Sequence, residues 1–139
     1  MARMYDPDNL GNRRAETIER ILPLIDGFFR RYHRATVRGL DRLPRGPALL
    51  VGNHSGASLS IDTFLFAAAL IKERGVDALP FGLAHDFVLR LPVLNPLLSE
   101  IGAVRACEEN AHRLFALGRQ VMKKFRSLRA GVLSGSWRL

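Results

Sequence analysis

The sequence predicts an α/β protein: alternating strands and helices around a mostly parallel sheet, incomplete at the C-terminus, with an amphipathic N-terminal helical segment. Short apolar runs of strand length alternate with longer stretches of helical periodicity, which is typical of strand–helix–strand units. Such units make successive strands parallel, with right-handed crossovers. Polar residues follow the apolar runs, and ligands of parallel sheets bind beyond these carboxyl ends.

The chain begins with a polar stretch, residues 1–12, which we expect to be a flexible arm. Apolar residues at helical spacing then predict an amphipathic helical segment over residues 13–38. Pro23 and Gly27 interrupt it, so we expect a kinked helix or two short ones. Two interpretations stay open for this segment: an ordinary surface helix packed on the core, or a helix lying on anionic membrane.

Residues 39–122 form the predicted α/β domain. Its first strand covers residues 48–52 and leads through a small polar loop into a helix. Ser58 or Ser60 caps this helix, which extends to about residue 74.

Further elements follow in the same alternating order. The pattern predicts a second strand over residues 79–84, short helical pieces within 87–98 that two prolines separate, and a third strand over 101–104. A helix over residues 108–117 has acidic residues in its first turn and a glycine after it, as expected from the helix dipole and from C-terminal capping.

The last part of the chain differs in composition. Residues 121–122 begin a fourth strand, but Lys123 and Lys124 interrupt it, so we expect a separate basic tail over residues 123–139. The net charge is +8, and residues 110–139 contain seven basic residues and no acidic one. Few aromatic residues lie among these charges, so we expect no specific nucleic-acid partner.

Composition bounds the class of protein. Hydrophobic residues make up 47% of the chain, enough to bury a core. Cys107 is the only cysteine, which excludes an intramolecular disulfide and fits a reducing cytosol. Residues 1–10 lack the apolar region of a signal peptide, and the longest apolar run, residues 64–71, is shorter than the roughly 20 residues that span a bilayer. We therefore expect a cytoplasmic protein.

The stretch after the first strand carries the most distinctive chemistry. His54 follows the strand, and Asp62 lies eight positions later at the start of the next helix. A neutral imidazole accepts a proton near neutral pH, and a carboxylate on its other nitrogen fixes the tautomer and stabilises the imidazolium. No Gly-x-Ser-x-Gly motif supplies a nucleophile. Such a pair suits activation of a substrate hydroxyl that attacks an acyl donor directly.

Other polar residues follow the next two strands. His85 and Asp86 come after the second strand and Arg105 after the third, so all should lie at one edge of the sheet with His54. Structural roles remain open for each of them: a capping residue, a hydrogen-bonded histidine, or an arginine in water. Combined with Asp62, the histidines and aspartates could hold a metal, but no H-E-x-x-H or cysteine-pair spacing supports this, so we expect none.

One stretch resembles a known family. Residues 49–56, Leu-Leu-Val-Gly-Asn-His-Ser-Gly, with Asp62 downstream, resemble the first motif of the lysophospholipid/glycerolipid acyltransferase superfamily, most closely its bacterial diacylglycerol-acyltransferase-like branch. The common motif has four residues between histidine and aspartate; here seven intervene, and this branch commonly has such a glycine-containing spacer. Residues 32–47, 84–86 and 101–111 resemble neighbouring parts of the family pattern.

The resemblance implies an enzyme that transfers a fatty acyl group from acyl-CoA or acyl carrier protein to a hydroxyl of a glycerolipid, without a cofactor. It assigns His54 as the general base and Asp62 as its partner. We add Asn53, Ser55 and Gly56 as substrate-binding candidates. The family also implies peripheral association with an anionic membrane surface, on its cytoplasmic face.

Two further residues receive weaker assignments. Arg105 lies where the second family motif contacts the acceptor, and His85 lies in the matching block. Beyond Met122 the Pro-Gly-Gly or Pro-Glu-Gly motif of the family does not follow. We therefore expect a truncated or frame-shifted acyltransferase that has lost activity. The alternative is a non-catalytic basic protein that binds membranes or nucleic acid through its tail.

Overall fold

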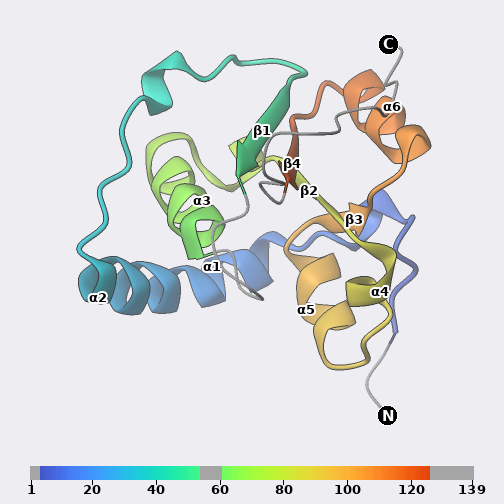
Figure 1. Cartoon of the computed structure of the whole chain (residues 1–139), viewed down its shortest axis with the longest axis horizontal. Helices are drawn as coiled ribbons and strands as arrows, with labels where there is room; N and C mark the ends of the chain where they lie inside the picture. Colours follow the sequence, from blue (N-terminus) through green and yellow to red (C-terminus); the bar gives the residue numbers. More distant parts are fainter. Residues whose placement is uncertain (1–3, 54–60, 126–139) are drawn as a thin grey trace, which may run out of the picture.

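The computed structural model describes residues 4–53 and 61–125. These residues form a parallel sheet of four strands: β1 (Leu49–Asn53), β2 (Phe81–Ala84), β3 (Ala103–Arg105) and β4 (Val121–Phe125). The strand order is β1-β4-β2-β3 (Figure 1). Helices connect the strands, so the predicted α/β class is confirmed.

The last strand lies in the middle of the sheet. β4 pairs with β1 from Leu49↔Val121 to Asn53↔Phe125, and its first residues also pair with β2. The predicted interruption at Lys123 and Lys124 is therefore wrong, and the predicted start of a separate tail falls inside this strand. Pairing along the whole of β1 outweighs the weak strand propensity of lysine, whose aliphatic stem packs on a sheet while its ammonium group reaches outward.

The N-terminal helical segment is continuous but not uniformly α-helical. It consists of α1 (Ala15–Leu24), the π-helical segment η2 (Ile25–Arg30) and α2 (Arg31–His33). Pro23 lacks the N–H that would bond four residues back, and the chain widens into a π-helix just after it instead of kinking sharply. The left-handed conformation of Arg34, with φ of 48°, ends the helix.

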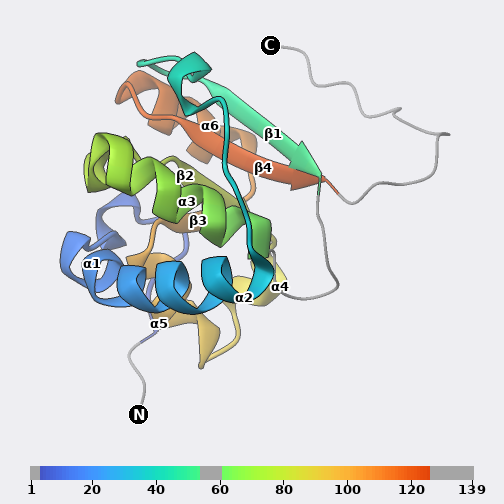
Figure 2. The same ribbon diagram turned by 90° about the vertical axis from the view of Figure 1, so that its left-hand side faces the viewer.

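The helices form layers around the sheet. Helix α3 (Ile61–Arg74) lies between the sheet and the α1–η2 segment, whereas α6 (Glu108–Ala116) lies on the other side of the sheet (Figures 1 and 2). Helices α4 (Asp86–Leu89) and α5 (Leu94–Glu100) pack beside β3. No helix within the described ranges combines the length and apolar character needed to cross a membrane.

The first described residues form hydrogen bonds with the rest of the domain, although their composition predicts a flexible arm. The Tyr5 N–H donates to Asn95 Oδ1 at 2.6 Å, and the Tyr5 hydroxyl donates to Glu100 at 2.6 Å. Thr17 also donates to Glu100 at 2.7 Å, and hydrogen bonds from Tyr5 and then Thr17 lower the pKa of this carboxyl group. These partners lie more than 80 positions along the sequence, so local composition could not reveal them.

One part of the core lies between β2, β3, β4 and α6. Phe81, Val104, Leu114 and Val121 form its buried cluster. β2, β3 and β4 thus each contribute a side chain to one apolar contact with α6, and the burial of these side chains holds the helix on the sheet.

We predict that Leu114→Ala destabilises the protein by about 2–5 kcal/mol, because it leaves a cavity in this cluster. The side chain of Leu114 is 0% exposed, whereas Leu117 at the end of the same helix is 65% exposed. Urea unfolding followed by circular dichroism measures both variants. Leu117→Ala is the matched control, and equal losses in the two variants would contradict the assigned core.

Candidate active site

The carboxyl ends of all four strands lie at one edge of the sheet, because the strands are parallel. Asn53 is the last residue of β1, and its backbone lies opposite Phe125 of β4. His54, Ser55 and Gly56 come next in the chain and lie outside the described residues. Their roles stay predictions, but the strand that precedes them ends at the edge where ligands of parallel sheets bind.

Asp62 lies close to this edge on a second element. It is in the first turn of α3, where the helix dipole favours a negative charge, and its side chain is 44% exposed. Its carboxylate accepts a hydrogen bond from Lys124 Nζ of β4, whose side chain is only 15% exposed. Two elements far apart in the sequence thus hold this carboxylate in place.

The lysine lies beside a residue of β1 that has no side chain. Gly52 lies opposite Lys124 in the strand register. A Cβ atom at Gly52 would lie 3.5 Å from Lys124 Cε, an ordinary contact distance, so a small side chain there would touch the lysine stem without displacing it. The sequence interpretation missed Lys124, since it treated the lysine pair only as the end of a strand.

An apolar groove of about 370 Å³ opens beside this ion pair. Its lining comes from β1, β4, α3 and the segment before β1: Leu43, Leu49, Leu50, Val51, Gly52, Asp62, Thr63, Phe66, Met122 and Lys124. Buried Thr63 Oγ1 has no hydrogen-bond partner among the described residues. The groove therefore suits a ligand with an apolar body and a polar end near Asp62.

The other predicted site residues lie near β3 and are already engaged. Arg105 forms ion pairs with Asp8 at 3.1 Å and with Asp86 at 3.3 Å. The Arg105 Nε and Asp86 Oδ1 atoms are close enough for an ion pair but do not form a hydrogen bond. Each of these two atoms lacks a hydrogen-bond partner within the described part of the chain. Two carboxylates thus offset the charge of this guanidinium. The contact with Asp8, 97 positions away, has no signal in the sequence.

His85 has a local structural role. It is the N-cap residue of α4, where its Nδ1 accepts a hydrogen bond from the Phe87 N–H at 3.2 Å, and its ring is exposed. This contact fixes the tautomer, with the proton on Nε2 when the ring is neutral. The exposed Nε2 remains able to donate to a ligand.

The sheet order divides the predicted residues into two groups. Asn53 and Asp62 lie at the β1 end, and His85 and Arg105 lie at the β2–β3 end. Three strand spacings separate β1 from β3, about 14 Å. One extended ligand could contact both groups. No cluster of three or more potential metal ligands occurs in the part of the chain that the structure describes.

We predict an energetic coupling between Asp62 and Lys124. Asp62→Asn leaves a mostly buried ammonium group without its charged partner and should cost about 1–3 kcal/mol, whereas adding Lys124→Met should recover part of this loss. A double-mutant cycle from urea unfolding measures the coupling. Lys72→Met is the control, since Lys72 lies about 15 Å further along α3 and pairs with Asp26. Additive effects of Asp62→Asn and Lys124→Met would contradict the contact.

Comparison with known proteins identifies the family. A sequence model of the family described as Acyltransferase matches residues 34–133, which include His54, Asp62, Arg105 and Lys124. Uncharacterized proteins of Mycobacterium bovis and Mycobacterium tuberculosis are each 36% identical over 99 residues, and one of Mycobacterium leprae is 35% identical. The match covers 70% of this chain and 27% of each relative, so the chain spans far less than their full length. No solved structure matches. The chain belongs to the acyltransferase family.

Proposed function

We propose that the chain carries the site of a glycerolipid O-acyltransferase of the bacterial diacylglycerol-acyltransferase-like branch. His54 removes the proton of the acceptor hydroxyl, and the oxygen attacks the carbonyl carbon of an acyl-CoA or acyl carrier protein thioester. The carbon–sulfur bond then breaks, and the thiolate takes the proton back from the imidazolium. Asp62 orients the imidazole and stabilises its charged form.

The observation that carries this proposal is the family match, which spans both residues of the pair. The position of Asp62 at the carboxyl edge of a parallel sheet supports it, since ligands of such sheets bind there. The groove beside Asp62 also supports it. Apolar side chains dominate its lining, so it would accommodate a fatty acyl chain.

The remaining candidates would contact the substrates at the same edge. Asn53, Ser55 and Gly56 surround the base in sequence and would bind the reacting groups. His85 and Arg105, at the far end of the edge, would contact the acceptor headgroup. Because Arg105 is paired with Asp8 and Asp86, an anionic headgroup would have to compete with these carboxylates.

We predict that His54→Ala lowers acyl transfer by about 100- to 10,000-fold, the usual contribution of a general base. Release of free thiol from acyl-CoA, with diacylglycerol or lysophospholipid as acceptor, measures the rate. The control is His112→Ala, which removes an exposed imidazole that interacts with Glu108 of the same helix, outside the candidate active site. Full activity in His54→Ala would exclude the mechanism. No thiol release by the unaltered chain with either acceptor or an acyl carrier protein donor would show that this chain is inactive, as the absence of the Pro-Gly-Gly motif predicts, and retained vesicle binding would not by itself favour the non-catalytic alternative.

We also propose that the α1–η2–α2 segment lies on the cytoplasmic face of an anionic membrane. Leu24, Phe28 and Tyr32 recur every fourth residue along it and are 60–75% exposed. The rings of Phe28 and Tyr32 stack with centroids 6.1 Å apart. The same segment carries exposed basic residues: Arg20, Arg30, Arg31 and Arg34. Apolar groups flanked by cations suit the interface of an anionic bilayer.

We predict that Leu24→Ser weakens binding to vesicles of phosphatidylglycerol roughly tenfold, because it removes an apolar side chain from the membrane interface. Sedimentation with vesicles measures the partition, and phosphatidylcholine vesicles test the dependence on charge. Leu117→Ser is the matched control, since both leucines are 65% exposed and Leu117 lies at the end of α6, across the sheet. An equal effect of both substitutions would show that the segment is not the contact surface.

A further inference from the structure

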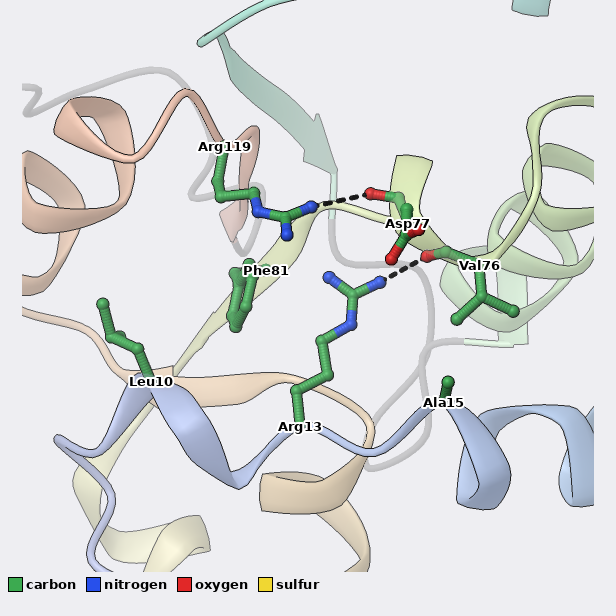
Figure 3. A pocket seen from close by; sticks show the side chains of 7 residues that line it. All are labelled: Leu10, Arg13, Ala15, Val76, Asp77, Phe81 and Arg119. Carbon is green, nitrogen blue, oxygen red and sulfur yellow. Dashed lines mark hydrogen bonds between the residues drawn. The ribbon is translucent and has the colours of Figure 1, made fainter.

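A second cavity lies at the opposite end of the strands from the candidate active site. It has a volume of about 260 Å³, and its walls come from the N-terminal segment and from the segments that lead into β2 and β4 (Figure 3). The lining residues are Leu10, Arg13, Ala15, Val76, Asp77, Phe81 and Arg119. None of them belongs to the candidate active site, so this cavity requires its own explanation.

Arg13 forms the floor of the cavity and is firmly held. Its Nη1 donates to Leu79 O at 2.7 Å and its Nη2 to Val76 O at 2.6 Å. The guanidinium lies over the Phe81 ring, 4.9 Å from its centroid. A Cβ atom at Gly102 would lie 3.2 Å from Arg13 Cδ, so a glycine makes room for the stem. Only two of the five N–H donors of a guanidinium are used in these hydrogen bonds.

Arg119 approaches from the opposite wall. It follows Gly118, whose φ of 71° turns the chain from α6 toward β4. Its Nη1 donates to the backbone oxygen of Asp77 at 3.1 Å (Figure 3). Its other guanidinium N–H groups have no hydrogen-bond partner among the described residues. Both guanidinium groups thus point into the same small space with unused donors.

The charges in this space are unbalanced. Two guanidinium groups face a single carboxylate, that of Asp77, and neither forms a direct ion pair with it within the described chain. Burial and then repulsion from Arg119 lower the pKa of Arg13 to about 10, and attraction to Asp77 offsets this only in part. The folded protein therefore holds a cation where a second positive charge opposes it. An anion between the two arginines would relieve that repulsion.

We propose that Arg13 and Arg119 bind a small phosphate group in this cavity. Guanidinium groups pair with phosphate through parallel N–H···O bonds, and converging forks from two walls can contact several of its oxygens at once. The volume lies just below the range of drug-sized ligand sites, about 300–1,000 Å³, which favours a free phosphate or a small phosphomonoester. The site is independent of acyl transfer and would remain if the proposed reaction were wrong.

Isothermal titration calorimetry with inorganic phosphate, at constant ionic strength, tests the site. The unaltered chain should bind one phosphate saturably. Arg119→Gln should weaken binding about ten- to a hundredfold, since it removes charge-assisted hydrogen bonds. Asp77→Asn should strengthen binding, because it removes the competing negative charge and keeps the backbone oxygen that Arg119 contacts.

Arg45→Gln is the matched control: it removes the same charge from an exposed arginine outside the cavity and should leave binding unchanged. Absence of saturable binding to the unaltered chain overturns the proposal, as does an equal loss in Arg119→Gln and Arg45→Gln. Weaker binding by Asp77→Asn would also overturn it. Thermal unfolding of each variant confirms that it is folded, and Arg119 is chosen over Arg13 because its side chain is exposed.

A second experimental arm identifies the source of the phosphate. Glycerol phosphate and vesicles that contain phosphatidic acid each compete against inorganic phosphate. Competition by glycerol phosphate alone assigns the cavity to a soluble phosphomonoester, and competition by the vesicles assigns it to a lipid headgroup. Competition by neither restricts the site to free phosphate, and all three results agree with a phosphate site formed by Arg13 and Arg119.

Discussion

The insertion of β4 between β1 and β2 is the constraint on which the rest of the structure depends. Within the described chain, the backbone of β1 finds its sheet partner only in β4, across about seventy positions of sequence. Without β4, the backbone N–H and C=O groups of β1 would have no hydrogen-bond partners in the sheet. The sheet therefore depends on this long-range pairing. Such non-local pairing also carries a loop-closure cost, which slows the folding of parallel sheets.

The same strand serves both ends of the sheet. Arg119, just before β4, reaches the cavity at the amino ends, and Lys124, near its end, reaches Asp62 at the carboxyl edge. The two residues lie five positions apart, which is roughly 17 Å along an extended chain. Changes in β4 would therefore affect the candidate active site and the proposed phosphate site together, although the two share no residue.

Ion pairs shape the carboxyl edge as much as the order of the strands does. Lys124 holds Asp62 at one end, and Asp8 and Asp86 hold Arg105 at the other. The Arg105 pairs are partly exposed, so they contribute modestly to stability, and their main effect is to fix where charges lie. The N-terminal segment contributes directly to this edge, since Asp8 forms an ion pair with Arg105 and the backbone N–H of Arg105 donates to Pro7 O.

The sequence by itself determined the fold class, the position of most elements and the location of the polar residues at strand ends. Hydrophobic periodicity depends only on residues that are close in the sequence, so the sequence alone reveals it. The same local pattern predicts the place of Asp62 at the start of a helix, where the structure has it. His54 was named from its place after a strand, and it lies outside the described residues.

Only the tertiary structure decided the order of the strands and the partners of the charged side chains. Lys123 and Lys124 argue against a strand locally, but pairing with β1 keeps them in one. The contacts of Asp8 with Arg105 and of Lys124 with Asp62 join residues that no spacing rule relates. Charge pairs and strand order depend on which residues meet in three dimensions, and the spacing of residues along the sequence does not specify this.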